Sequence, residues 1–289
     1  MTDQQYIGRC IQLAKLAAGE VATNPMVGAV LVYEDKIIGE GFHKKYGEPH
    51  AEVNCINNVE EKNRSLIEKS TMYVSLEPCA HHGKTPPCAD LIIKHKIKKV
   101  VLGCRDIYEK VAGKGIEKLQ NAGVEVVMDV LKKECLEVNK RFFIFHQKKR
   151  PFIILKWAQS ANGKISSGNK RILISNDYSN RLVHKWRSQE AGILVGTNTV
   201  LKDNALLTTR LWKGKSPVRI VIDKELKLPL SFKIFNEDSK TIVFNLYKSA
   251  TEKNLQFIKL ENNDFLNEIV HSLFENEIQS VLVEGGAKT

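Results

Sequence analysis

Four residues in the first half of the chain have the types and the spacing of an open metal site. His50 and Glu52 form a His-x-Glu pair, and Cys79 and Cys88 each follow a proline. One imidazole and two thiolates suit the borderline-soft Zn²⁺ ion and leave its fourth tetrahedral position for water. Glu52 carries a carboxylate placed to move protons to and from such a water. The predicted chemistry is therefore hydrolysis at a zinc centre.

The pattern resembles the H-x-E…P-C-x-x-C signature of zinc nucleobase deaminases, but here eight residues separate the two cysteines. Cys88 follows Pro87 at a predicted helix start, where the helix dipole favours a thiolate. A lone His-x-Glu pair is more often an ordinary helix surface, but the two Pro-Cys pairs downstream favour a metal site. His81 and His82, between the cysteines, remain competing ligands on spacing alone.

The elements that must position these residues alternate between helix and strand, and the first two predicted strands form a hairpin. The helical spacing of apolar residues predicts helices over 4–18, 50–59 and 88–96. Runs of β-branched and apolar residues predict strands over 27–33, 36–41, 71–75, 98–103 and 124–128. This alternation predicts an α/β layered domain.

A polar and basic stretch from Gln147 to Pro151 separates the two halves of the chain. We therefore expect one domain over 1–146 and a second α/β domain over 151–289. The second half has predicted helices over 178–189 and 264–275, and predicted strands over 152–157, 192–195, 218–223, 241–245, 256–260 and 279–284. The sequence contains neither a Rossmann glycine fingerprint nor a P-loop.

Composition excludes several classes of protein. The 289 residues are 43% hydrophobic and 27% charged, and no apolar run approaches the roughly 20 residues of a membrane span. The N-terminal segment does not have the pattern of a secretory signal, so the six cysteines are expected to be reduced thiols in the cytoplasm. The net charge of +11 is dispersed over the chain, which favours an anionic small molecule over nucleic acid.

The segments LEPCAHHGKTPPC, TNPMVGAV and HAE resemble the deaminase half of the RibD family, the bifunctional riboflavin-biosynthesis enzymes of bacteria. The resemblance implies a cytidine-deaminase-like three-layer α/β/α fold. It also implies hydrolytic deamination of 2,5-diamino-6-ribosylamino-4(3H)-pyrimidinone 5′-phosphate. The family usually has Pro and Asn after its Arg-Asp pair, where this chain has Ile107 and Tyr108. By motif match, the substrate contacts are Asn24, His43, Lys84 and Asp106.

The segments LKWAQSANGKIS, ILVGTNTVLKDNALLTTR, PVRIVID and VLVEGG resemble the reductase half of the same family. The resemblance implies a dihydrofolate-reductase-like α/β domain that uses NADPH to reduce the ribosyl group of the deaminated product to ribityl. Family members continue beyond the position of Thr289, so we expect this domain to be short at its C-terminus. The implied substrate contacts are Lys156, Arg187, Leu207, Arg210 and Glu284, and the implied cofactor contacts are Leu173, Thr199, Asp203, Gly285 and Gly286.

Arg187 and Arg210 have side chains that can pair with a phosphate through two parallel hydrogen bonds. Glycines such as Gly285 and Gly286 let backbone N–H groups approach the pyrophosphate of a cofactor. We therefore expect Zn²⁺ and NADPH as cofactors and a phosphorylated pyrimidine as substrate, with no nucleic-acid or membrane partner. The sequence leaves the oligomeric state open, a homo-oligomer included.

Two alternatives remain open on the residues. A tRNA or nucleotide deaminase with an appended domain would use the positive charge, although such families favour the short P-C-x-x-C spacing. A non-catalytic zinc-stabilised module that binds nucleotides or RNA would close its site with a fourth ligand, His81 or His82, and would tolerate Glu52→Gln.

Overall fold

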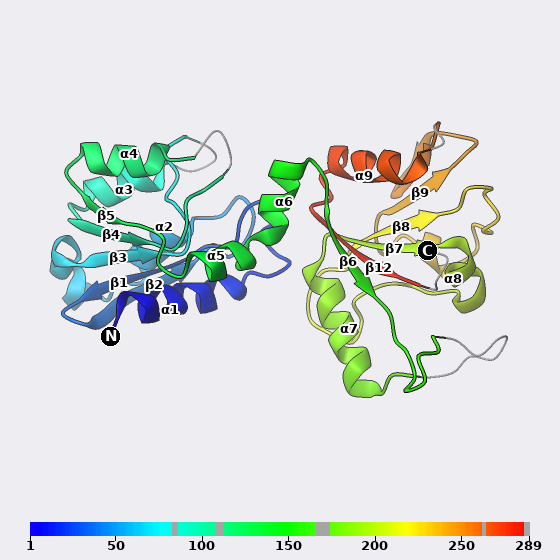
Figure 1. Ribbon diagram of the computed structural model, residues 1–289, viewed down its shortest axis with the longest axis horizontal. Helices are drawn as coiled ribbons and strands as arrows, with labels where there is room; N and C mark the ends of the chain where they lie inside the picture. The colour runs from blue at the N-terminus through cyan, green and yellow to red at the C-terminus, as the bar shows by residue number, and fades with distance from the viewer. Residues whose placement is uncertain (83–85, 108–111, 166–173, 262–263, 286–289) are drawn as a thin grey trace. The chain divides into compact units, whose positions relative to one another are not determined.

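The computed structural model describes residues 1–289 apart from 83–85, 108–111, 166–173, 262–263 and 286–289. Contacts within the chain divide it into two compact units, residues 1–147 and 148–289, each with its own sheet (Figure 1). The division falls within the basic stretch between the halves. In the described part of the chain, no helix has both the length and the apolar character that crossing a bilayer requires.

The first unit is built on a five-stranded sheet in the order β2-β1-β3-β4-β5. Strand β1 pairs antiparallel with β2 and β3, while β3, β4 and β5 are parallel. The predicted hairpin is therefore confirmed. The elements in chain order are α1 (Asp3–Lys15), β1 (Gly28–Tyr33), β2 (Lys36–Phe42), α2 (Ala51–Asn57), η1 (Glu61–Lys69), β3 (Thr71–Val74), α3 (Cys88–Lys94), β4 (Lys99–Leu102), α4 (Lys114–Asn121), β5 (Glu125–Val127), α5 (Lys132–Val138) and α6 (Lys140–Lys148).

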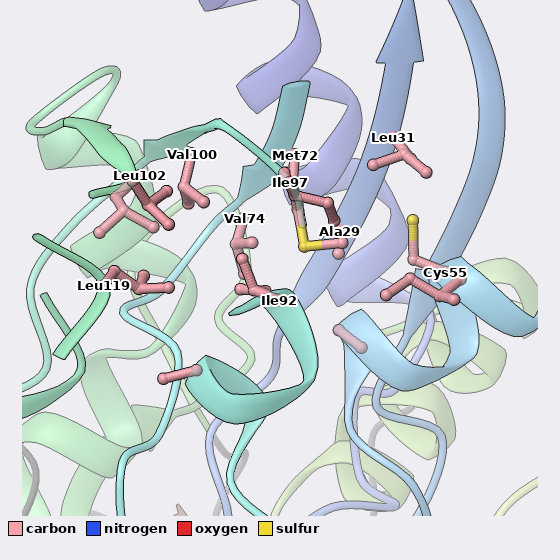
Figure 2. Close-up of a cluster of buried hydrophobic side chains, with 14 of the residues drawn as sticks. Ala29, Leu31, Cys55, Met72, Val74, Ile92, Ile97, Val100, Leu102 and Leu119 are labelled. Carbon is pink, nitrogen blue, oxygen red and sulfur yellow. The ribbon is translucent and has the colours of Figure 1, made fainter. Parts of the chain in front are cut away.

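Helices cover both faces of this sheet, which confirms the predicted three layers. Successive residues of a strand point to opposite faces, so Ala29 and Leu31 of β1 pack on α2 and α3, while Val30 and Val32 pack on α1. Figure 2 shows the first of these cores, in which Leu31, Met72 and Val74 of the strands meet side chains of the helices. Because both faces are covered, the central strands β1, β3 and β4 are mainly apolar and lack a regular polar alternation.

The second unit has a seven-stranded sheet in the order β10-β11-β9-β8-β7-β12-β6. All neighbouring strands are parallel except β10 and β11. One core packs against α9, a second packs around α8, and a smaller third lies on β9 and β11. The elements are β6 (Phe152–Lys156), α7 (Asp177–Gln189), β7 (Gly192–Gly196), α8 (Thr197–Asp203), β8 (Val218–Ile222), η2 (Lys233–Phe235), β9 (Thr241–Asn245), β10 (Ala250–Glu252), β11 (Leu255–Lys259), α9 (Phe265–Glu275) and β12 (Ser280–Glu284).

Several ends of elements meet at one edge of the first sheet. The carboxyl ends of the parallel strands β3 and β4 lie there, since Val74 pairs with Leu102. The start of β1 and the end of β2 lie there too, because Gly28 pairs with Phe42 and Ala29 pairs with Val74. The segments that follow or precede these ends carry every described residue that the sequence assigned to the metal and the deaminase substrate.

Gly41 of β2 allows this strand to lie close to α2, the helix that directly follows His50. A Cβ on Gly41 would lie 2.2 Å from the Cys55 nitrogen and 2.6 Å from the Ala51 oxygen, both in the backbone of α2. Only a residue without a side chain allows strand and helix backbones to approach so closely. The position of α2 therefore depends on this glycine.

Replacing Gly41 by alanine is expected to lower the free energy of unfolding of the first unit by about 1–3 kcal/mol, because the added methyl overlaps backbone atoms of α2. Gly8→Ala is the matched control. Gly8 lies within α1, where the nearest atom to an added Cβ is 4.0 Å away, so alanine should stabilise the helix by up to about 1 kcal/mol. Urea unfolding of both variants measures the difference, and equal effects would contradict the role of Gly41.

Candidate functional site

The three predicted metal ligands lie together in the first unit. His50 immediately precedes α2, Cys79 follows β3, and Cys88 is the first residue of α3. The Nδ1 atom of His50 lies 3.6 Å from the Sγ of Cys79 and 3.4 Å from the Sγ of Cys88. Atoms bound about 2.0–2.3 Å from a tetrahedral zinc are about 3.6 Å apart, so this donor set fits Zn²⁺.

The electrostatics of the two sulfur atoms also favour a cation between them. A hydrogen bond from the Cys88 thiol lowers the pKa of Cys79 to about 4, and the Cys88 backbone N–H donates to the same sulfur at 3.3 Å. The thiolate of Cys79 and burial together raise the pKa of Cys88 well above its usual value. Without a cation only one thiolate is stable here, whereas zinc binding releases the second proton.

Among the described residues, one cluster has possible metal-binding atoms that all lie within 4.8 Å of one another, and neither His81 nor His82 belongs to it. That cluster contains His50, Cys79 and Cys88 only. Three protein ligands are typical of catalytic zinc sites, which keep a position open, whereas structural sites have four. The geometry therefore favours the open site over the closed one.

Glu52 lies in the first turn of α2 with its side chain in the interior, 3% exposed. Burial raises the pKa of Glu52, and the neighbouring His50 opposes part of that rise. A carboxyl group whose pKa is raised toward neutrality can both accept and donate a proton during one reaction cycle. Glu52 therefore has the environment of a proton-transfer group.

A cavity of about 360 Å³ opens onto these residues. His50, Glu52 and Cys79 line part of its wall. The wall also contains three of the four residues that the sequence assigned to the pyrimidine substrate, Asn24, His43 and Asp106. The fourth, Lys84, lies outside the described residues. The expected substrate contacts and the metal ligands thus share one cavity.

Hydrogen bonds define the orientation of two of these contacts. The Nδ1 of His43 lies 3.2 Å from the carbonyl oxygen of Pro49, which can only accept. The Nε2 of His43 is therefore the acceptor for the amide nitrogen of Asn24, 3.2 Å away. Burial lowers the pKa of His43, which keeps the imidazole neutral in this arrangement. The Oδ1 of Asn24 remains as the oxygen that can accept a hydrogen bond from a substrate N–H group.

Two buried side chains that the sequence analysis missed hold the walls of the cavity. Asn139, just before α6, accepts a hydrogen bond from the Met26 N–H at 2.7 Å and donates to the Met26 carbonyl at 2.9 Å. Glu77 accepts backbone N–H groups of the segment that begins at Asp106. Glu77 stands in the LEPC motif beside the first cysteine, a signal that could have identified it. Asn139 carries no local signal, because its partner is 113 residues away.

In the second unit, three expected substrate residues come together at the carboxyl edge of the sheet. Lys156 ends β6, Glu284 ends β12, and the two pair across the parallel strands. The Nζ of Lys156 lies 3.8 Å from Glu284 Oε2, and Arg187 of α7 donates to Glu284 through Nη2 at 2.8 Å and Nε at 3.1 Å. Two nitrogens of the Arg187 guanidinium thus donate to the carboxylate of Glu284, and the bidentate phosphate contact expected of Arg187 stays a prediction.

The two remaining substrate-side residues lie in the segment after α8. Leu207 is 4% exposed and packs in the core with Val200, so its expected substrate contact stays a prediction. Arg210 is exposed, and its backbone N–H donates to the Nδ1 of buried His184 at 3.1 Å. Burial, together with the nearby Arg187 and Arg210, lowers the pKa of His184 to about 4, which leaves this acceptor neutral near pH 7. No motif in the sequence marks His184.

The cofactor-side residues follow two neighbouring strands. Thr199 and Asp203 belong to α8, which begins where β7 ends, and Gly285 follows β12 with a φ of 142°. Strands β7 and β12 pair in parallel, so both segments lie at one edge of the sheet, where α/β folds commonly bind ligands. Leu173 and Gly286 lie outside the described residues.

Comparisons with known families divide the chain in the same way. Residues 1–104 match the cytidine and deoxycytidylate deaminase zinc-binding region, and residues 151–289 match the RibD C-terminal domain. The first unit therefore contains a zinc-binding deaminase domain. The RibD C-terminal domain is consistent with the dihydrofolate-reductase-like fold expected from the sequence.

Similar proteins cover almost the whole chain. The riboflavin biosynthesis protein RibD of Aquifex aeolicus is 42% identical over 99% of this chain and 82% of that protein, and the Escherichia coli RibD is 32% identical over the same shares. A solved structure from Thermotoga maritima, a diaminohydroxyphosphoribosylaminopyrimidine deaminase/5-amino-6-(5-phosphoribosylamino)uracil reductase, superimposes with a TM-score of 0.91 at 40% identity. The match covers 99% of this chain and 81% of the Thermotoga maritima chain. The chain thus belongs to the RibD family, the bifunctional riboflavin-biosynthesis enzymes that join a zinc-dependent deaminase domain to a reductase domain.

Proposed function

We propose that the chain catalyses two consecutive reactions on a phosphorylated pyrimidine. The first unit deaminates 2,5-diamino-6-ribosylamino-4(3H)-pyrimidinone 5′-phosphate by hydrolysis. The second unit then reduces the ribosyl group of the resulting uracil to ribityl with NADPH. The observation that carries the proposal is the open cluster of His50, Cys79 and Cys88 beside Glu52 in one cavity. The deaminase and reductase activities of the similar Thermotoga maritima enzyme support it.

In the deaminase site, His50, Cys79 and Cys88 would hold a zinc ion, which supplies the Lewis acidity that activates water. Glu52 would take a proton from the attacking water and pass it to the ring nitrogen and then to the leaving ammonia. The C–N bond to the exocyclic amine breaks, and a carbonyl replaces it. Burial of Glu52, which raises its pKa, suits a group that must give the proton back.

Substrate orientation would come from the walls of the same cavity. The Oδ1 of Asn24 would accept a hydrogen bond from the pyrimidine, since the amide nitrogen already donates to His43. Asp106 lines the cavity after β4 and would bind the ribosyl arm. We assign Lys84 to the phosphate, because an ammonium group in the segment between the two cysteines provides a positive charge for it.

In the reductase site, NADPH supplies the hydride and the chain positions the sugar against it. Arg187 fixes the carboxylate of Glu284, and Lys156 provides a cation beside it at the end of β6. The exposed guanidinium of Arg210 would bind the phosphate, with its backbone held by His184. The segments with Thr199, Asp203 and Gly285 would hold the cofactor.

The remaining expectations stay predictions. These are a cytoplasmic location and the lack of a nucleic-acid or membrane partner, while the oligomeric state stays open, a homo-oligomer included. The family and the three-ligand cluster both favour a small-molecule enzyme over an RNA-binding zinc module.

Product analysis with the diaminopyrimidinone ribotide tests the proposed function. The wild type is expected to release ammonia and form the uracil, and to form the ribityl product when NADPH is added. Glu52→Gln should keep the zinc content of the wild type and lose deamination by a factor of about 10²–10⁴, because the proton-transfer group is gone. Glu61→Gln, an exposed carboxylate in η1, is the control. Retained turnover in Glu52→Gln would overturn the mechanism.

Lys156→Ala is expected to reduce NADPH oxidation by a factor of about 10² or more and to leave deamination unchanged, because the cation beside Glu284 is removed. Asp203→Ala should likewise affect only the NADPH-dependent step. NADPH consumption, measured by absorbance, and ammonia release are followed on the same preparations. Lys240→Ala, which changes an exposed lysine, is the control. A parallel loss of both activities in a folded variant would contradict the assignment of separate sites.

The stability of the second unit should depend on the protonation of His184. Its pKa is lowered from 6.5 to about 4, so the unfolded chain binds the proton more readily than the folded unit does. The free energy of unfolding is therefore fully retained above pH 6.5 and falls as the pH drops from 6.5 toward 4. Urea unfolding of wild type and His184→Gln at several pH values measures this slope, which should be weaker in the variant; equal slopes would exclude His184.

A further inference from the structure

The carboxylate of Glu77 lies at the cavity of the deaminase site and is surrounded by backbone N–H groups. Glu77 follows β3, is 4% exposed, and lines the cavity. Its Oε2 accepts the N–H of Asp106 at 3.2 Å and that of Gly113 at 3.0 Å. Its Oε1 accepts the N–H groups of Gly115 at 3.0 Å and Ile116 at 3.4 Å. One side chain thus binds Asp106 and the described residues at the start of α4.

The negative charge of Glu77 is stabilised by these N–H groups and by a helix end. None of the ion pairs found among the described residues includes Glu77. Gly115 and Ile116 lie in the first turn of α4, where unpaired N–H groups and the helix dipole favour a negative charge. A buried carboxylate is costly unless such donors surround it, and hydrogen bonds to a charged acceptor are strong.

Close packing also fixes the start of α4 against the residues beside Cys79. A Cβ on Gly115 would lie 1.9 Å from the carbonyl oxygen of Pro78 and 3.3 Å from the Cγ of Glu77. Gly113 has a φ of 81°, and a Cβ there would lie 1.8 Å from Nη2 of Arg105. The start of α4 and the chain that carries Cys79 are therefore in direct backbone contact, and Glu77 joins both to Asp106.

We infer that Glu77 is a positioning residue for the deaminase reaction. It holds Asp106 on the cavity wall at a fixed place relative to the ligand Cys79, two residues further along the chain. Neither the metal nor the substrate needs to touch Glu77 for this role. The inference rests on the proposed function for the role of Asp106 in binding substrate, but the hydrogen bonds themselves do not depend on it.

Hydrogen exchange of the zinc-loaded full chain tests whether Glu77 holds the segment. In Glu77→Gln the side-chain amide presents its NH₂ group to two of the four N–H donors, so the exchange of the Asp106, Gly113, Gly115 and Ile116 amides is expected to accelerate roughly tenfold or more. Asp223→Asn is the matched control, a buried carboxylate of the second unit that accepts the N–H groups of Lys227 and Leu228. It should leave exchange in the first unit unchanged. Wild-type exchange in Glu77→Gln would overturn the inference.

Steady-state kinetics then separate positioning from a general loss of structure. With the diaminopyrimidinone ribotide, Glu77→Gln should raise KM roughly tenfold, as expected for a weakened substrate contact, while kcat and zinc content stay close to the wild-type values. A fall in kcat that matches a loss of zinc, with KM unchanged, would assign Glu77 to metal-site folding alone and overturn the inference.

A second variant keeps the test decisive if Glu77→Gln does not fold. Glu77→Asp keeps the charge but withdraws the carboxylate by one methylene, so faster exchange and a higher KM are again expected. Wild-type exchange and KM in Glu77→Asp would contradict a role that depends on the length of this side chain. Failure of the wild type to deaminate the ribotide would refute the proposed function, while the exchange result would still decide whether Glu77 holds the segment.

Discussion

The first unit depends on three donor atoms that approach one another closely at one edge of the sheet. His50 and both cysteines come from separate segments, and two sulfur atoms so close cannot both ionise unless a cation lies between them. The fold supplies the necessary convergence. The end of β3 and the starts of α2 and α3 meet there, and Gly41 lets α2 approach the β2 backbone closely enough to bring His50 into place. The metal ligands therefore converge only because the topology of the sheet brings these three segments together.

Much of this centre could be predicted from sequence because the chemistry restricts the residue types. Zinc accepts few kinds of ligand, and a proton-transfer carboxylate must lie near them, so residue type and spacing point to His50, Glu52, Cys79 and Cys88. Spacing left His81 and His82 open as ligands, and only the fold places them outside the cluster. The hairpin of β1 and β2 was equally visible, since both strands are short apolar runs around a polar turn. The helices α4, α5, α6 and α8 were missed, as were η1, η2 and the short strand β10. These elements are short, so their own sequence stabilises them weakly and packing against the rest of the unit decides their structure.

The residues that hold the sites in place could not be predicted in the same way. Asn139 and His184 bind backbone groups, which are present at every position and so leave no trace in the sequence. Glu77 also binds backbone groups, and only its place in the LEPC motif marks it. Arg187 is a different case. Its residue type predicts an anionic partner, and in the structure two of its guanidinium nitrogens donate to Glu284, 97 residues away. Sequence shows that a charge is present, whereas only the fold shows which opposite charge lies beside it.

The two units balance the charged groups at the ends of their strands in different ways. Each places charged groups after neighbouring parallel strands, Cys79 and Asp106 after β3 and β4, and Lys156 and Glu284 at the ends of β6 and β12. In the first unit the thiolates require a metal cation, so the site changes its charge when zinc binds. In the second unit Arg187 and Lys156 balance Glu284 within the chain itself. It follows that the deaminase site is complete only with its ion, whereas the carboxylate of the reductase site is already held by the chain before any ligand binds.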